Sequence, residues 1–129
     1  MPVELKMLAW SILLGVIYVL LATTLGIPQR GMAWLASNRE GESKLLSGAA
    51  GRCDRASRNF LETFVFFAAA VLAVIAAQRT NASTALGAQL FFWARVVYLP
   101  VYVVGIPYLR TLVWATSLAG LLMVAFALL

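Results

Sequence analysis

Long apolar segments constrain this chain more than any other feature of its sequence. A helix that crosses a bilayer needs about 20 mostly apolar residues, and Met7–Ile27 meets this length without a single charged residue. Four such segments are predicted, at about residues 7–27, 56–78, 82–105 and 109–129. Helices are expected because every backbone N–H and C=O group in lipid must be bonded within the segment. No alternation typical of barrel strands is present.

The composition supports a membrane environment. Hydrophobic residues make up 63% of the 129 residues and charged residues only 12%, whereas soluble domains average about 45–50% apolar and a quarter charged. We therefore predict an all-α fold, an integral membrane four-helix bundle that forms one domain over residues 1–129. Residues 7–27 are interpreted as a retained span and not as a signal peptide, because residues 1–6 are not basic and no Ala-x-Ala site follows.

Helix-breaking residues place the connections between the spans. Gly26-Ile27-Pro28 is predicted to end the first helix, Asn81-Ala82-Ser83 to form a short turn after the second, and Gly105-Ile106-Pro107 to separate the third from the fourth. The first connection is the long one, and it is expected to lie on the same side of the membrane as the third.

Basic residues are distributed unevenly between the two sides. One side carries seven of the ten: Arg30, Arg39, Lys44, Arg52, Arg55, Arg58 and Arg110. The other side carries Lys6 and Arg79, and Arg95 lies within a span. The positive-inside rule then places the first and third connections in the cytoplasm and both termini on the non-cytoplasmic side. The expected location is the bacterial inner membrane, as a multi-pass protein.

The charge and the rare residue types exclude several kinds of chemistry. The net charge of +5 is assigned to membrane topology and not to nucleic-acid binding, because no Lys/Arg-rich run is interleaved with aromatic residues. The chain has no histidine, which removes the commonest general base and metal ligand. No metal is predicted. Cys53 is the single cysteine and is interpreted as a small packing residue.

Polar residues inside the spans are the candidates for function, because an ionisable group at mid-membrane costs about 2.5–3.5 kcal/mol on insertion scales. In the second span, Arg55, Asn59 and Glu62 fall on one helical stripe. In the third span, Arg95, Tyr98 and Tyr102 share a face in the same way. Both stripes lie toward the cytoplasm, so we expect one polar cleft there.

The residue types in this cleft indicate a small zwitterionic ligand. Guanidinium groups form bidentate, charge-assisted bonds to carboxylates, and Arg110 lies just beyond the third span. A carboxylate such as Glu62 suits an ammonium group or amide N–H donors, and tyrosines supply hydroxyls. A peptide with more than one carboxylate, such as glutathione, has the matching groups.

Structural explanations remain open for each of these residues. The arginines from Arg52 to Arg58 also suit positive-inside anchors, and Glu62 suits an ion pair with Arg55 or Arg95. The two tyrosines suit interfacial belt positions. The remaining aromatic residues of the second and third spans are expected to face lipid or to pack in the core.

Two sequence motifs identify a family resemblance. Residues 53–63 contain Arg55-Ala-x-x-Asn59-x-x-Glu62, which resembles the second-helix signature of the MAPEG family (membrane-associated proteins in eicosanoid and glutathione metabolism). Residues 94–102 are similar to that family's pattern Ala-Arg-x-x-(Tyr/His)-x-x-x-Tyr, with Arg95, Tyr98 and Tyr102 in place. The span number, the long basic first connection and the length also agree.

The resemblance implies a homotrimer that binds glutathione between protomers near the cytoplasmic surface. It assigns glutathione contacts to eight residues: Arg30, Arg55, Arg58, Asn59, Glu62, Arg95, Tyr98 and Tyr102. Arg110 is the one candidate for the family's thiolate-stabilising arginine. The implied activity is that of a membrane-bound glutathione transferase or peroxidase acting on lipophilic electrophiles. Small residues on the second and fourth spans, including the motif Ala115-x-x-x-Ala119-Gly120 on the fourth, are expected to help protomers pack.

The chain departs from the family pattern after the glutamate. Thr63 stands where some members carry an aromatic hydroxyl, and Phe64-Val65 replaces a phenylalanine–proline pair, which predicts a straighter helix. A non-catalytic protein with the same fold is therefore an alternative. A small multidrug exporter is another, but such proteins use a carboxylate embedded in the first helix, and Met7–Ile27 contains none.

Overall fold

The computed structural model describes residues 1–40 and 45–129, and every described element is a helix. Lys44, one of the basic residues used to predict the topology, lies outside the described residues. The helices run in this order: α1 (Val3–Arg30), α2 (Met32–Ala36), α3 (Gly48–Ala76), α4 (Ala82–Val104) and α5 (Pro107–Phe126). The four long helices are each long and apolar enough to cross a membrane.

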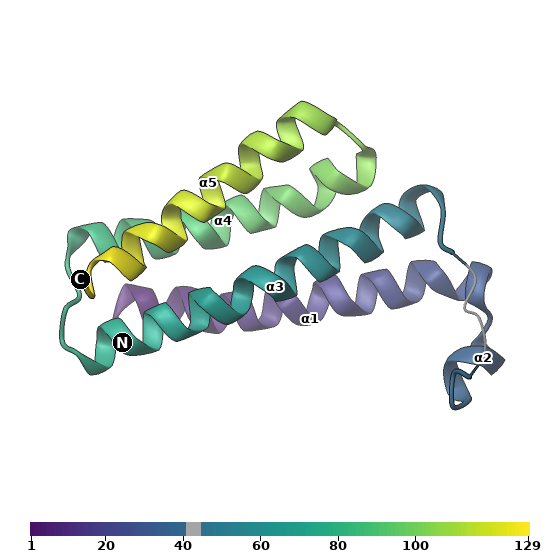
Figure 1. Cartoon of the computed structure of the whole chain (residues 1–129), viewed down its shortest axis with the longest axis horizontal. Helices are drawn as coiled ribbons and strands as arrows, with labels where there is room; N and C mark the ends of the chain where they lie inside the picture. Colours follow the sequence, from purple (N-terminus) through teal and green to yellow (C-terminus); the bar gives the residue numbers. More distant parts are fainter. Residues whose placement is uncertain (41–44) are drawn as a thin grey trace.

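The long helices form two antiparallel pairs. α1 lies beside α3 and α4 lies beside α5, while α4 also contacts both α1 and α3 (Figure 1). Both termini lie at one end of the bundle, and α2 and the turn between α4 and α5 lie at the other (Figure 1). This arrangement agrees with the predicted connections, although the helix boundaries differ from the predicted ones.

The predicted end of the first helix was wrong. α1 continues through Pro28 to Arg30, although proline removes one backbone donor. The Gln29 side chain holds this last turn: its Oε1 accepts from the Ser47 N–H (2.9 Å) and its Nε2 donates to the Ser47 carbonyl (3.1 Å). This bridge also holds the residue before α3, and α3 begins at Gly48 and not near residue 56.

The other predicted boundaries are close to the observed ones. Asn81 begins α4 with a capping box, in which its side chain accepts from the Thr84 N–H and the Thr84 hydroxyl accepts from the Asn81 N–H. α4 runs through Pro100 and ends at Gly105, which adopts the left-handed conformation (φ +90°) that favours glycine. The short helix α2 was not predicted.

Aromatic rings fill the centre of the bundle. Phe60 of α3 stacks on Tyr18 of α1 at 4.6 Å between centroids, and Phe67 stacks on Phe91 of α4 at 4.0 Å. The Tyr18 hydroxyl donates to the carbonyl of Arg95 (2.6 Å), so this buried hydroxyl has a hydrogen-bond partner. These contacts tie α1, α3 and α4 together beside the polar residues of α4.

Large apolar side chains also cover the outside of the bundle. Trp93 is 58% exposed and Phe66 is 66% exposed, as the sequence predicts for lipid-facing aromatic residues, whereas Phe67 and Phe91 are fully buried. An apolar exterior around an apolar core is what a lipid solvent requires.

Glycines set the closest approach of α4 to α5. A Cβ atom on Gly87 would lie 2.6 Å from the Gly120 carbonyl oxygen, so the two backbones touch where neither residue has a side chain. Gly120 therefore packs within the protomer, while its neighbours Ala115 and Ala119 are exposed on α5. Only those two alanines of the predicted α5 motif remain available for a contact between protomers.

Candidate polar cavity

A polar cavity of about 360 Å³ opens between α3, α4 and α5. Its lining comes from three helices: Arg55, Arg58, Asn59 and Glu62 of α3, Tyr98 and Tyr102 of α4, and Arg110 of α5. Seven of the nine sequence-predicted site residues thus meet in one place. Three guanidinium groups and one carboxylate leave this lining with a formal excess of positive charge.

The α3 residues reach the cavity through helical spacing. Arg55, Asn59 and Glu62 lie four and three residues apart, which places them on one face. Asn59 is half-buried, whereas Arg55, Arg58 and Glu62 are exposed. The inner part of the cavity is therefore fixed by the bundle, and its charged rim is open.

Tyr102 lies between two arginines. Its hydroxyl accepts a hydrogen bond from Arg55 Nε (3.3 Å), and the Arg110 guanidinium lies 4.9 Å from the centre of its ring. A cation over a tyrosine face is attracted by the ring quadrupole. Tyr102 thus positions a cation from α3 and another from α5, and its ring meets Tyr98 edge-on at 5.4 Å.

Arg95 is a site residue that the structure places elsewhere. It does not line the cavity; its side chain is fully buried behind it. Arg95 Nη1 donates to Asn59 Oδ1 (2.7 Å) and Nη2 donates to Thr63 Oγ1 (2.8 Å). Its guanidinium also lies 4.8 Å from the centre of the Tyr98 ring. Arg95 supports cavity residues and does not reach the cavity itself.

The charged residues of the rim form few ion pairs. In the described part of the chain the one ion pair joins Arg58 to Asp54 at 3.4 Å, between exposed or partly exposed side chains. Such a surface pair contributes little stability. The interpretation of Glu62 as an ion-pair partner of Arg55 or Arg95 is wrong for this protomer, and the Glu62 carboxylate is open to the cavity.

Arg30 lies in an adjoining hollow. This second space of about 240 Å³ shares Arg55 and Arg58 with the polar cavity and adds Arg30 and Asp54. Arg30 lies 5.9 Å from the centre of the Trp34 ring in α2, and its Nε is buried without a protein partner among the described residues. The end of α1 thus brings a fourth cation to the edge of the polar cavity.

Sequence reasoning missed two polar contacts near this site. Thr63 accepts from Arg95 and follows Asn59 by four residues, a spacing that already places both on one face. Arg52 donates from Nε to the Val103 carbonyl (2.8 Å) and so fastens the end of α4 to α3. The interpretation of Arg52 as a positive-inside anchor did not predict this contact.

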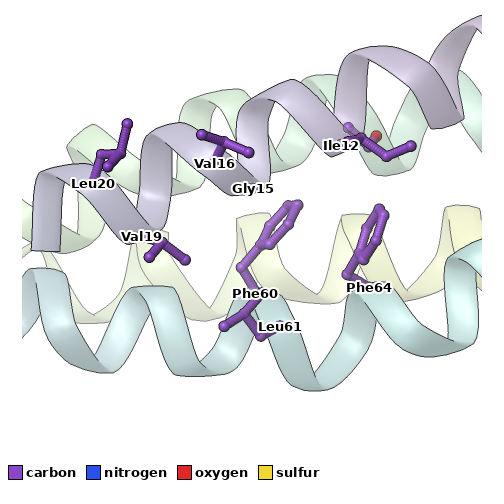
Figure 2. Close-up of a pocket in the computed structure, with 9 residues that line it drawn as sticks. Ile12, Gly15, Val16, Val19, Leu20, Phe60, Leu61 and Phe64 are labelled. Carbon is purple, nitrogen blue, oxygen red and sulfur yellow. The ribbon is translucent and has the colours of Figure 1, made fainter. Parts of the chain in front are cut away.

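A separate apolar groove of about 280 Å³ lies between α1 and α3 (Figure 2). Gly15 of α1 faces the Phe60 ring, and the remaining walls are formed by Ile12, Val16, Val19, Leu20, Leu61 and Phe64. Ser11 also lines it, with a buried hydroxyl oxygen that has no protein partner among the described residues. Phe60, Leu61 and Phe64 lie on a different face of α3 from Asn59 and Glu62, so this groove is distinct from the polar cavity.

Metal ligands are not gathered at either site. Over residues 1–40 and 45–129, no group of three His, Cys, Asp or Glu side chains is placed to hold a metal ion. The chemistry of the polar cavity rests instead on guanidinium, carboxylate, amide and phenol groups.

The fold and the cavity define a class of protein: a multi-pass integral membrane protein with four apolar helices and a basic, polar cavity at one end of the bundle. The chain belongs to the MAPEG family, whose model matches residues 7–129. This family includes glutathione transferases and also non-catalytic members. No curated protein and no solved structure matches the chain.

Proposed function

We propose that this protein is a membrane-bound, glutathione-dependent transferase or peroxidase that acts on lipophilic electrophiles. The observation that carries the proposal is the polar cavity, in which Arg55, Glu62 and Arg110 come from two helices and face one space. Its volume of about 360 Å³ falls within the usual range of about 300–1,000 Å³ for small-molecule sites.

The functional groups of glutathione fit the lining. The peptide carries two carboxylates, which suit the guanidiniums of Arg55 and Arg58 with Arg30 beside them. It carries one ammonium group, which suits the exposed Glu62 carboxylate. The two tyrosine hydroxyls and the Asn59 amide supply neutral partners. Membership of a glutathione-related family supports the same ligand.

Arg110 is the proposed catalytic residue. A thiol reacts as its thiolate, and a guanidinium nearby favours the anion. The thiol proton passes to water, the sulfur forms a bond to the electrophilic carbon, and the leaving group departs with the bonding pair. With a hydroperoxide, the thiolate attacks the terminal hydroxyl oxygen and forms a sulfenic acid; the O–O bond breaks, and the alkoxide leaves with the bonding pair and takes a proton from water to become the alcohol. A second glutathione then converts the sulfenic acid to the disulfide and releases water.

The proposed assembly is a homotrimer whose neighbouring protomer closes the cavity. The rim supports this arrangement, because Arg55, Arg58 and Glu62 are exposed in a single chain although charged groups within a bilayer need partners. The lipophilic substrate would reach the site from the surrounding lipid.

The proposed orientation places the cavity at the cytoplasmic face of a bacterial inner membrane. Both termini share one end of the bundle, and the described basic residues of the first connection lie toward the other (Figure 1). The positive-inside rule supports placing the basic end in the cytoplasm.

The test uses thiolate absorbance of glutathione bound to purified protein. Arg110→Ala is expected to abolish the signal, and the control Arg79→Ala is expected to retain it, because Arg79 is exposed at the opposite end beside Leu128. An unchanged signal in Arg110→Ala removes Arg110 from its role. Glutathione binding without turnover of any electrophile in a panel would place the chain among the non-catalytic members.

The exporter alternative is not supported. The family match assigns the chain to MAPEG. Because α1 begins at Val3, the first helix does contain a buried carboxylate, Glu4, but it lies in the first turn. Glu4 Oε1 accepts a hydrogen bond from the Thr84 hydroxyl (2.6 Å), which makes it a link between α1 and the start of α4.

A further inference from the structure

The buried guanidinium of Arg95 is neutralised by no carboxylate in the described part of the chain. Its two terminal nitrogens donate to neutral oxygens, Asn59 Oδ1 at 2.7 Å and Thr63 Oγ1 at 2.8 Å. The residue is fully buried, so water does not compete for these bonds. A fully buried cation with amide and hydroxyl partners is costly to maintain, which indicates that its position serves something beyond packing.

The chemistry of the guanidinium fixes the orientation of the Asn59 amide. Arginine has five N–H donors and no acceptor, whereas an asparagine side chain has one acceptor oxygen and a donor NH₂ group. The atom of Asn59 that faces Arg95 must therefore be Oδ1. The NH₂ group is left on the other branch of the amide, where no described residue accepts from it, and Asn59 lines the polar cavity.

Thr63 and Tyr18 hold Arg95 in the position from which it contacts Asn59. The Thr63 hydroxyl donates to the carbonyls of Asn59 or Phe60 (both 3.1 Å), which leaves its lone pairs for Arg95. The Tyr18 hydroxyl donates to the Arg95 backbone carbonyl, which fixes α4 at this residue. The guanidinium therefore lies between two fixed acceptors. If the Asn59 amide were flipped, its NH₂ group would face the N–H groups of Arg95, and two donors would be opposed.

We propose that Arg95 is a positioning residue that locks the Asn59 NH₂ group toward the cavity, where it donates to a carboxylate or carbonyl oxygen of the bound ligand. Glu62, one helical turn further on, presents the opposite chemistry, since it only accepts. Asn59 and Glu62 thus bind an acceptor group and a donor group of the ligand, respectively, about one helical turn apart. This inference rests on the proposed function for the identity of the ligand, glutathione, but the orientation of Asn59 does not.

The main test is Asn59→Asp, which keeps the shape and replaces the NH₂ group by an acceptor oxygen. Glutathione binding measured by calorimetry is expected to weaken about 10- to 100-fold. The ligand oxygen loses the NH₂ donor of Asn59 and faces an acceptor oxygen of the aspartate instead. Binding equal to the wild type would overturn the proposal.

Side-chain amide resonances give a readout that a merely structural role would not move. With ¹⁵N-labelled asparagine, the Asn59 NH₂ protons are expected to shift downfield at saturating glutathione. The Asn81 amide is the matched control, because its oxygen caps α4 at the opposite end, and its signal should stay in place. An unmoved Asn59 signal in the bound protein would contradict the proposal.

Substitutions at Arg95 test the positioning itself. Arg95→Met frees the amide to rotate, so that about half of the molecules present the oxygen, and binding is expected to weaken at least about twofold. Arg95→Lys retains a donor for Oδ1 and should restore most of the loss. Thr116→Val is the control, because the exposed Thr116 hydroxyl of α5 donates to the Leu112 carbonyl and does not contact Arg95, so binding should be retained. Equal binding by the Met and Lys variants would refute the positioning role.

Thermal stability without ligand separates this inference from the proposed function. Asn59→Asp places a carboxylate on the buried cation and should be at least as stable as the wild type, whereas Asn59→Leu should be less stable. If wild-type protein binds no glutathione, the proposed function fails while this comparison still decides the orientation. An Asp variant as unstable as the Leu variant would overturn the inferred contact between Arg95 and Oδ1.

Discussion

The close approach of α4 and α5 gives a sharp prediction for Gly87→Ala. An added Cβ would lie 2.6 Å from the Gly120 carbonyl oxygen and 2.8 Å from Met123 Cβ. Ordinary contacts begin near 3.5 Å, so the helices must separate by about 1 Å. Overpacking of this kind costs about 1–3 kcal/mol, and the better helix propensity of alanine returns at most about 1 kcal/mol.

Gly26→Ala is the matched control for that substitution. Gly26 also lies inside a long helix, but its added Cβ would meet only the Leu46 side chain at 3.5 and 3.7 Å, which is ordinary contact. The control should therefore gain up to about 1 kcal/mol from helix propensity. Because the propensity gain is common to both variants, they are expected to differ by the overpacking cost of about 1–3 kcal/mol in the free energy of unfolding, with Gly87→Ala the less stable.

The single cysteine provides the assay. Cys53 is free and fully buried, so a thiol-reactive fluorescent dye reports unfolding in detergent as temperature rises. Gly87→Ala is expected to melt roughly 4 °C or more below Gly26→Ala, and Gly26→Ala should melt at or above the wild type. Equal melting temperatures for the two variants would refute the close contact between α4 and α5.

Three further predictions concern the cavity. Tyr102→Phe removes the acceptor of Arg55 but keeps the ring beneath Arg110, so calorimetry should show weaker glutathione binding while thiolate absorbance at saturation persists. A free thiol has a pKa of about 8.5 and a nearby cation lowers it, so the acidic limb of the pH–rate profile should move to higher pH in Arg110→Ala; an unmoved limb would contradict the thiolate role. Arg52→Met loses the bond to the Val103 carbonyl and should lower the free energy of unfolding by about 1 kcal/mol without weakening glutathione binding. A loss of glutathione affinity in this variant would contradict the assigned cavity lining, which does not include Arg52.

The sequence predicts the four spans because each depends on a long apolar segment, which is a local property. Boundaries depended on contacts that no local pattern contains. α1 passes Pro28 and ends at Arg30, where Gln29 bonds to Ser47, and these two residues come from opposite ends of the first connection. The same bridge holds Ser47, the residue that precedes α3.

The cavity was predictable in part for the same reason. Helical periodicity places Asn59 and Glu62 on one face of α3, and the structure places both in the lining. Periodicity does not report depth, however. Arg95 shares a face with Tyr98 and Tyr102, but its side chain lies beneath that face and reaches α3 at Asn59. The partner of a long side chain on another helix cannot be read from spacing within one helix.

A calorimetric titration of the purified wild-type protein with glutathione tests the central claim most directly. A cavity with three arginines and one exposed carboxylate predicts saturable binding within the millimolar range, accompanied by thiolate absorbance from the bound peptide. The absence of saturable heat and of thiolate absorbance at millimolar glutathione would contradict the assignment of this cavity as a glutathione site.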